Sequence, residues 1–179
     1  MLLMKRGVLA ATVVVAAFTV SGCVPDINAN PESSSAIQQV IERAIDRRNQ
    51  QLMAGVESSV DEISQDFVQD SVAGIAQDYE LLHQRRERLA SHAFGYTGIR
   101  SGITMKELTV SRDRAEALVS EKTQISYPPV GGVQGPEEGY VYEQKVTLEK
   151  VGTQWKIITQ GPASPEGLLP STVIDHRSG

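Results

Sequence analysis

The sequence has a single cysteine, Cys23, among 179 residues, so no disulfide can form within the chain. A metal cluster held by several thiolates is excluded for the same reason. Aromatic residues make up only 5% of the chain, which leaves few large rings to fill a core. A chain of this length suits one domain of ordinary size, and we expect packing of aliphatic side chains to stabilise it.

Long runs of basic residues are also missing. Asp and Glu outnumber Lys and Arg by 22 to 17. The basic residues cluster only in pairs, such as Arg47-Arg48 and Arg85-Arg86. Binding to a phosphate backbone needs a concentrated basic face. We therefore expect no nucleic-acid partner.

The motifs of common enzymes are missing too, namely the nucleophile elbow, the glycine-rich phosphate loop and H-E-x-x-H. Glu80 and His83 have the E-x-x-H spacing of di-iron bundles, but such a site needs two copies and further carboxylates. Glu62, Asp66 and Asp70 form an acidic stripe that we expect to be a solvated helix face, because a calcium site needs a turning loop. The sequence predicts no enzyme, no cofactor and no metal site.

The longest apolar run, residues 8–20, is shorter than the roughly 20 residues that a membrane-spanning helix needs. Two basic residues precede it and two small residues follow it, as in a secretory signal. The segment Val20-Ser21-Gly22-Cys23 resembles the lipobox of bacterial lipoproteins. The resemblance implies that residues 1–22 are removed and that Cys23 carries the lipid. The alternative is an ordinary secretory signal that is cut near a cysteine by chance.

Lipidation of Cys23 would make the membrane a partner and would place the protein on the extracytoplasmic face of the cell membrane. Residues 23–34 are rich in Pro, Asn and Ser and predict a flexible tether. Residues 35–160 carry the periodic patterns of a folded domain. Residues 161–179 show no periodicity and predict a flexible C-terminal tail, with His176 in it.

Apolar residues recur at helical spacing in the first half of that domain. A helix is predicted over 35–53, with a capping box that starts at Ser35 and a stop at Gly55. Residues 57–93 continue as helix with a break near Asp70-Ser71, and Gly95 ends this region. We expect His92, near the helix end, to favour the negative end of the helix dipole.

The period changes from 3.6 to 2 after Gly102. Strands are predicted over 103–110, 115–127, 138–150 and 153–160, with a tight turn at 111–114. Helices followed by an antiparallel meander predict an α+β domain, in which the N-terminal helices pack on a curved four-stranded antiparallel sheet.

This order of elements resembles the nuclear transport factor two-like, or cystatin-like, cone. The segments "GYTGIRSGITMKELTVSRDRAEALVSEKTQISY" and "EEGYVYEQKVTLEKVGTQWKII" also resemble the region N-terminal to the amidase domain of some secreted Gram-positive proteins. Residues 161–179 are too few for an amidase domain, and Cys23 is the sole cysteine. We therefore expect no hydrolase activity in this chain.

A cone of this kind can enclose a pocket between the long helix and the concave sheet. The alternative is that the aromatic rings simply fill the core. The alternation shows no strand acid that points clearly inward, which argues against a general base. The candidate pocket residues are Tyr79, Phe94, Tyr96, Tyr127, Tyr140, Tyr142 and Trp155.

The most distinctive loop is "YPPVGGVQGPEEG", residues 127–139, which is longer than the usual hairpin loop. Loops longer than the scaffold requires often carry recognition, so we predict a partner-binding surface here. The alternative is a tolerated insertion. The candidate contact residues are Pro128, Pro129, Val130, Gln134, Pro136 and Glu137.

Three interpretations of the function follow. The leading one is a lipid-anchored extracytoplasmic lipoprotein that binds an envelope protein or a peptidoglycan-associated partner. The second is a small-molecule-binding or isomerase-like protein that uses a cone pocket. The third is a remnant of the amidase arrangement that serves a separately encoded catalytic chain.

Overall fold

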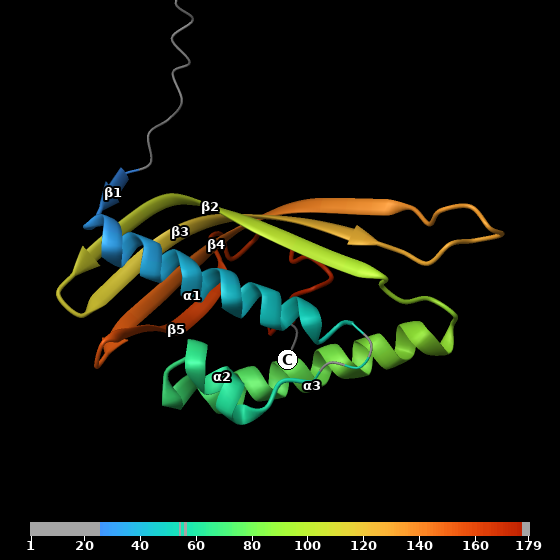
Figure 1. Cartoon of the computed structure of the whole chain (residues 1–179), viewed down its shortest axis with the longest axis horizontal. Helices are drawn as coiled ribbons and strands as arrows, with labels where there is room; N and C mark the ends of the chain where they lie inside the picture. Colours follow the sequence, from blue (N-terminus) through green and yellow to red (C-terminus); the bar gives the residue numbers. More distant parts are fainter. Residues whose placement is uncertain (1–25, 54, 56, 177–179) are drawn as a thin grey trace, which may run out of the picture.

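The computed structural model describes residues 26–176, except 54 and 56. The three helices lie on one side of a long, curved sheet (Figure 1). This arrangement confirms the predicted α+β class with helices packed on a curved antiparallel sheet. The elements are β1 (Asp26–Asn28), α1 (Pro31–Gln50), α2 (Val60–Asp66), α3 (Gln69–Ser91), β2 (Gly98–Ser111), β3 (Arg114–Ser126), β4 (Glu137–Val151) and β5 (Gln154–Pro162).

The sheet has the simple order β1-β2-β3-β4-β5. Strands β2 to β5 form the predicted antiparallel meander. The short strand β1 pairs in parallel with β2, with Asp26 opposite Glu107. Within residues 26–34 the structure therefore differs from the tether that the sequence predicts over 23–34. Three residues that pair with a distant strand edge leave no periodic pattern in the sequence.

Helix α1 begins earlier than the capping box at Ser35 predicts. The side chain of Asn30 accepts a hydrogen bond of 2.7 Å from the backbone N–H of Ser33. Pro31 occupies the first turn, where its missing N–H costs no hydrogen bond. The N-terminal cap of α1 therefore lies inside the segment that we predicted to be a flexible tether.

The helix break lies at Phe67-Val68, before the predicted position near Asp70. Phe67 adopts an extended conformation and forms an isolated bridge with Ile157 of β5. The N–H of Val68 donates a hydrogen bond of 3.0 Å to the carbonyl of Ile157. The break is thus set by pairing with a distant strand, which local helix signals do not reveal.

Strand β2 starts at Gly98 and is longer than the predicted 103–110. A β-bulge between Met105 and Glu107 shifts its register against β3. The bulge interrupts the alternation along β2, so the periodic pattern covers only part of the strand. In β3 the predicted alternation holds from Ala115 to Ile125.

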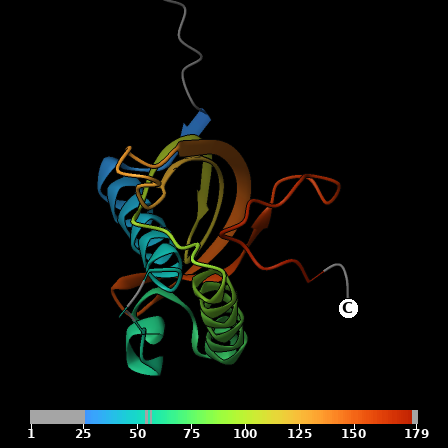
Figure 2. The same ribbon diagram turned by 90° about the vertical axis from the view of Figure 1, so that its right-hand side faces the viewer.

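The core lies between the concave face of the sheet and one face of α1, with α3 beside it (Figure 2). No helix among the described residues is long and apolar enough to cross a membrane. The fully buried aliphatic residues at the centre of the core include Ile37, Ile41, Ile45, Leu52, Leu82, Leu108, Val119, Val146, Leu148 and Ile157.

The C-terminal segment, residues 163–176, folds back against the domain, where the sequence predicts a flexible tail. Thr172 is fully buried, and its hydroxyl lies 2.5 Å from that of Tyr140. Arg85 of α3 donates hydrogen bonds to the carbonyl oxygens of Ser171 and Val173. These contacts join the segment to both the sheet and the long helix.

Candidate functional site

The most unusual feature of the interior is a buried carboxylate, Glu121 on β3, which has no exposed surface. The guanidinium of Arg48, from the last turn of α1, lies 2.6 Å from it. The hydroxyls of Thr123 and Tyr140 donate to it at 2.7 Å and 3.0 Å. The amide of Gln144 donates to its second oxygen. We call these five residues the Glu121 cluster.

The Glu121 cluster corrects the expectation that no strand acid points inward. Glu121 lies between Val119 and Thr123 in the alternation of β3, and all three residues are buried. The signal was therefore present in the sequence, because residues two apart share one face of a strand. An acidic side chain does not suit an apolar face, and its burial is tolerable because partners from α1, β2, β3 and β4 bind it.

Further polar residues extend the cluster across the domain. The Ser101 hydroxyl accepts from Asn49 of α1 at 2.7 Å and lies 2.5 Å from that of Thr123. Gln160 of β5 donates to Gln144 at 2.7 Å. Polar contacts thus connect α1 with four strands. Networks of this kind favour one arrangement of the core, because any other would leave buried groups unpaired.

The same contacts restrict the chemistry that Glu121 can perform. Its two oxygens accept from five side chains, including the Ser101 hydroxyl at 3.4 Å, and its charge is balanced by Arg48. Burial, followed by the nearby Glu121 charge, raises the pKa of Tyr140. A carboxylate engaged in this way is not free to take a proton from a substrate, so the geometry disfavours a general base at Glu121.

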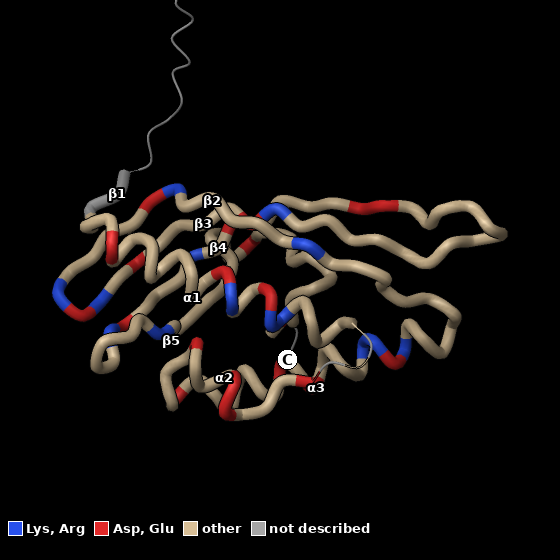
Figure 3. Tube along the Cα trace, in the orientation of Figure 1, with Lys and Arg blue, Asp and Glu red and all other residues tan. Residues whose placement is uncertain are grey.

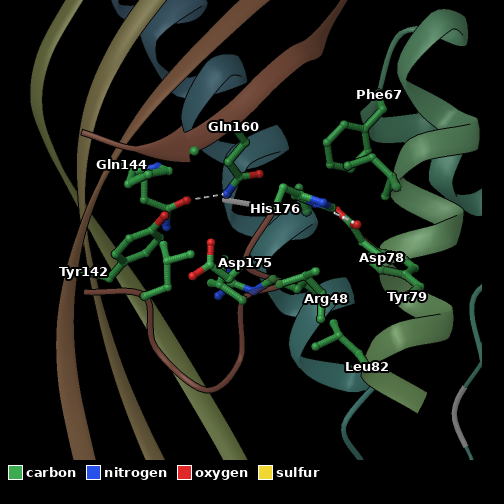
Figure 4. Close-up of a pocket in the computed structure, with 17 residues that line it drawn as sticks. Arg48, Phe67, Asp78, Tyr79, Leu82, Tyr142, Gln144, Gln160, Asp175 and His176 are labelled. Carbon is green, nitrogen blue, oxygen red and sulfur yellow. Dashed lines mark hydrogen bonds and ion pairs between the residues drawn. The ribbon is translucent and has the colours of Figure 1, made fainter. Parts of the chain in front are cut away.

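A cavity of about 180 Å³ lies beside this cluster. It is bounded by α1, α3, β4, β5 and the end of the C-terminal segment (Figure 4). Arg48 and Gln144 belong both to the cavity wall and to the Glu121 cluster. The apolar part of the wall includes Phe67, Ile75, Leu82, Leu169, Val173 and Ile174.

The cavity also has polar groups near the C-terminal segment. Asp78 and Asp175 lie in its wall, and Nε2 of His176 lies 2.9 Å from Oδ1 of Asp78. This contact gives His176 a defined position, in contrast to the predicted tail. The acidic groups lie in the same wall as Arg48, whose charge is already paired.

The aromatic residues predicted to line one pocket divide into several groups. Tyr79 and Tyr142 line the cavity. Tyr140 lies in the Glu121 cluster, and Trp155 is buried in the core. The rings of Tyr96 and Tyr127 pack together with centroids 5.6 Å apart, and the Tyr127 hydroxyl donates to Glu138. Phe94 is 63% exposed.

The predicted partner-binding loop forms an extension of the β3–β4 hairpin, which we call the hairpin arm, residues 127–139. Val130 and Val133 exchange backbone hydrogen bonds of 3.0 Å and 3.1 Å around Gly131-Gly132. Both glycines have positive φ, as a tight hairpin turn requires. The other predicted contact residues Pro129, Gln134, Pro136 and Glu137 are exposed, and Pro128 is half-buried.

Two predicted surface features are wrong in part. Asp66 lies in the predicted solvated stripe but is fully buried, and it accepts hydrogen bonds from Arg43 at 2.9 Å and Arg47 at 3.0 Å. His83 lies 2.9 Å from the buried side chain of Gln51 and is largely covered. Arg43 and Arg47 of α1 cover Asp66, and Gln51, which directly follows α1, covers His83. All three are distant in sequence from the side chains that they cover.

The remaining predicted features are placed as follows. His92 is the C-terminal cap of α3, and its ring nitrogen lies 2.9 Å from the carbonyl of Arg88. Within the described residues, no three His, Cys, Asp or Glu side chains form a group suited to a metal ion. Cys23 and the rest of the predicted signal lie outside the residues that the structure describes.

The sequence matches no protein-family model and no curated protein. Solved structures give distant likenesses of the fold. The intermembrane-space region of the chloroplast protein ARC6 is 9% identical, with a TM-score of 0.47, over 75% of this chain and 97% of that one.

Two further likenesses are to NTF2-like proteins. One, involved in plasmid conjugation, is 11% identical with a TM-score of 0.34, over 76% of this chain and 51% of that one. The other, an NTF2-like transpeptidase from Campylobacter jejuni, is 15% identical with a TM-score of 0.24, over 73% of this chain and 99% of that one. At these values the likenesses concern the arrangement of elements and assign no function.

Proposed function

We propose that the protein is a lipid-anchored lipoprotein that binds a partner of the cell envelope on the extracytoplasmic side of the membrane. The lipidated residue in this proposal is Cys23, within the segment that resembles a lipobox. The observation that carries the binding role is the hairpin arm, an exposed extension of the β3–β4 hairpin none of whose described residues belongs to the core cluster. The fully engaged Glu121 argues for binding rather than acid–base catalysis.

The position of the arm supports this role. Strand β1 starts three residues after Cys23 and pairs with β2 near Glu107, which lies opposite Leu118 of β3. From Leu118 to the turn at Gly131 the chain runs for roughly 40 Å at strand spacing. Strand β1 and the arm therefore lie at opposite ends of the sheet (Figure 1). A lipid on Cys23 would leave the tip of the arm far from its point of attachment.

The surface of the arm is suited to a protein partner. Val130 and Val133 at its turn are 75% and 70% exposed, and Val141 further along β4 is 67% exposed. The tip carries no charge (Figure 3). Exposed aliphatic side chains on a hydrogen-bonded hairpin can bury apolar area against a partner, and the backbone loses less entropy on binding than a free loop does.

The anchor is tested by Cys23→Ala in the native host. We expect the variant to leave the membrane fraction and to lose labelling by a fatty-acid probe, because the acylated thiol is gone. Ser21→Ala keeps a small residue near the same site and should remain labelled. Unchanged membrane association and labelling of Cys23→Ala would refute the anchor.

The arm is tested by site-specific photocrosslinking in intact cells. A photoreactive residue at Val130 should capture a protein partner, and Val133→Ser should reduce that capture. A photoreactive residue at Val151 serves as the matched control, because this valine is also exposed but lies at the opposite end of β4. Equal capture of the same proteins from both positions would contradict recognition by the arm.

A further inference from the structure

Two hydrogen-bonding groups in the wall of the cavity have no partner among the described residues. The Tyr79 hydroxyl is buried, and the whole residue is only 5% exposed. Nε of Arg48 is also buried, although the other end of its guanidinium contacts Glu121 and Asn49. A buried donor without an acceptor costs free energy, so such groups point to a binding partner.

The size and wall of the cavity limit what that partner can be. A cavity of roughly 150 Å³ admits a benzene ring, and this one is about 180 Å³. Much of its wall is aliphatic or aromatic, including Phe67, Ile75 and Leu82. A molecule of roughly six to ten non-hydrogen atoms with a flat apolar body is therefore the right size.

The charges around the cavity favour a neutral molecule. The cation of Arg48 is balanced by Glu121 at 2.6 Å. The carboxylates of Asp78 and Asp175 lie in the same wall. A ligand carboxylate would meet two acids, while Arg48 already pairs with Glu121 and the His176 ring already contacts Asp78, so its burial would be unfavourable.

We infer that this cavity binds an uncharged aromatic or alicyclic carbonyl compound, whose oxygen accepts hydrogen bonds from Tyr79 and Arg48. The C-terminal segment closes one side of the site through Leu169, Val173 and Ile174. This site is separate from the hairpin arm, so it does not depend on the proposed envelope partner. The Glu121 cluster acts here as a positioning group, because it holds Arg48 in the wall.

The test uses the full chain in detergent micelles and a matched pair of probes. Acetophenone has the ring and the carbonyl, and cumene has the same number of non-hydrogen atoms without an acceptor. Methyl signals of Ile75, Leu82 and Val173 in ¹³C NMR report occupancy of the cavity. Ratios of affinity between protein variants cancel the partition of each probe into the detergent.

We expect acetophenone to shift these methyl signals saturably and benzoate at pH 7 to leave them unchanged. Tyr79→Phe should weaken acetophenone binding about 5- to 10-fold, because one hydrogen bond is lost. The same substitution should change cumene binding less than 2-fold. Tyr127→Phe is the matched control, since its hydroxyl bonds Glu138 outside the cavity, and it should leave both affinities unchanged.

A second variant tests the location. Ile75→Phe narrows the cavity from a partly buried position on α3 and should abolish the shifts at Leu82 and Val173. If this variant does not fold, the changes in acetophenone and cumene affinity caused by Tyr79→Phe still test the inference. Equal weakening of acetophenone and cumene, unchanged acetophenone binding in Tyr79→Phe, or no saturable shifts would overturn the inference and leave a cavity that holds water only.

Discussion

Nη2 of Arg48 lies 2.6 Å from Oε1 of Glu121, and this contact joins the last turn of α1 to the middle of β3. The Glu121 side chain has no exposed surface and that of Arg48 is 13% exposed. Each charge is stable inside the domain only because the other is present. The pair therefore holds α1 against the sheet. It also holds Arg48 in the wall of the neighbouring cavity, where the guanidinium forms part of the polar surface.

The first prediction concerns the stability that depends on this pair. Glu121→Gln should lower the free energy of unfolding by about 3–5 kcal/mol, because it leaves the Arg48 cation without a counter-charge. The double variant Arg48→Met with Glu121→Leu should lose less than the sum of the two single changes. Urea unfolding followed by circular dichroism measures the free energy of unfolding of Glu121→Gln, of Arg48→Met, of Glu121→Leu and of the double variant.

Glu116→Gln is the control for this prediction. Glu116 lies on the same strand but on the outer face, where it pairs with Lys145 at 2.9 Å with both side chains exposed. Its substitution should change the free energy of unfolding by less than about 1 kcal/mol. A loss in Glu121→Gln no larger than that in the control would show that the buried pair is unimportant.

The second prediction concerns alkaline pH. Burial is the main cause that raises the pKa of the Tyr79 hydroxyl above its ordinary value. The nearby cations Arg47 and Arg48 lower this pKa, and the carboxylates of Asp66 and Asp78 raise it. The folded state therefore holds the phenol proton more tightly than the unfolded chain does. This contribution to stability is complete below about pH 10 and is lost as the pH rises above it.

Tyr79→Phe should therefore flatten the fall in the free energy of unfolding between about pH 10 and pH 12. At pH 7 it should cost less than about 1 kcal/mol, because the hydroxyl has no protein hydrogen bond to lose. Tyr140→Phe provides the contrast, since it removes bonds to Glu121 and Thr172 and should cost about 1–3 kcal/mol at pH 7. Identical pH profiles for wild type and Tyr79→Phe would contradict the burial of this phenol.

The third prediction concerns the C-terminal segment. Thr172→Val removes the hydroxyl that contacts Tyr140 while keeping the size of the side chain. We expect faster cleavage of this segment in limited proteolysis, by about 5-fold or more, because release of the segment requires one hydrogen bond fewer. In Ser171→Val the contact of Arg85 with the backbone carbonyl remains, so its cleavage rate should stay close to that of the wild type. Equal rates for both variants would show that the Thr172 hydroxyl does not hold the segment.

The fourth prediction concerns the rigidity of the hairpin arm. A methyl group on Gly135 would overlap the carbonyl oxygens of Tyr127 and Pro128. Gly135→Ala should therefore disrupt the arm and raise amide exchange at Val130 and Val133 by about 10-fold or more, with less than about 1 kcal/mol lost globally. Hydrogen-exchange mass spectrometry reports this local change.

Gly102→Ala is suited as its control, because a Cβ there meets no atom within 4 Å and the residue lies in β2 opposite Lys122, outside the arm. Exchange at Val130 and Val133 should be the same as in the wild type. If Gly135→Ala also leaves it the same, the arm does not depend on the close approach at Gly135.

Elements whose apolar residues recur at a regular period were predicted well, because the period depends on local backbone geometry. The helical stripe of α1, from Ile37 to Ile45, and the alternation of β3 both appear as buried faces. Element ends were predicted less well. The cap at Asn30 and the break at Phe67 depend on specific bonds, one of them to Ile157 of a distant strand.

The candidate site was predicted only in part. Of the candidate pocket residues, Tyr79 and Tyr142 lie in one cavity wall, whereas Tyr96 and Tyr127 pack against each other. Glu121 was missed although its position in the strand indicated burial. Hydrophobic patterning assigns an acidic residue to the surface. It cannot show that a distant residue, here Arg48, pairs with the carboxylate and allows it to be buried.

The sequence by itself determined the order of helices and strands, the inward face of β3 and the lipobox-like segment at Cys23, since each depends on residues close together in the chain. Only the tertiary structure decided that Glu121 and Asp66 are buried, that residues 163–176 return to the domain, and that a cavity lies beside Arg48. Each of these depends on partners from distant segments, and the free energy of burying a charge is set by those partners rather than by its own side chain.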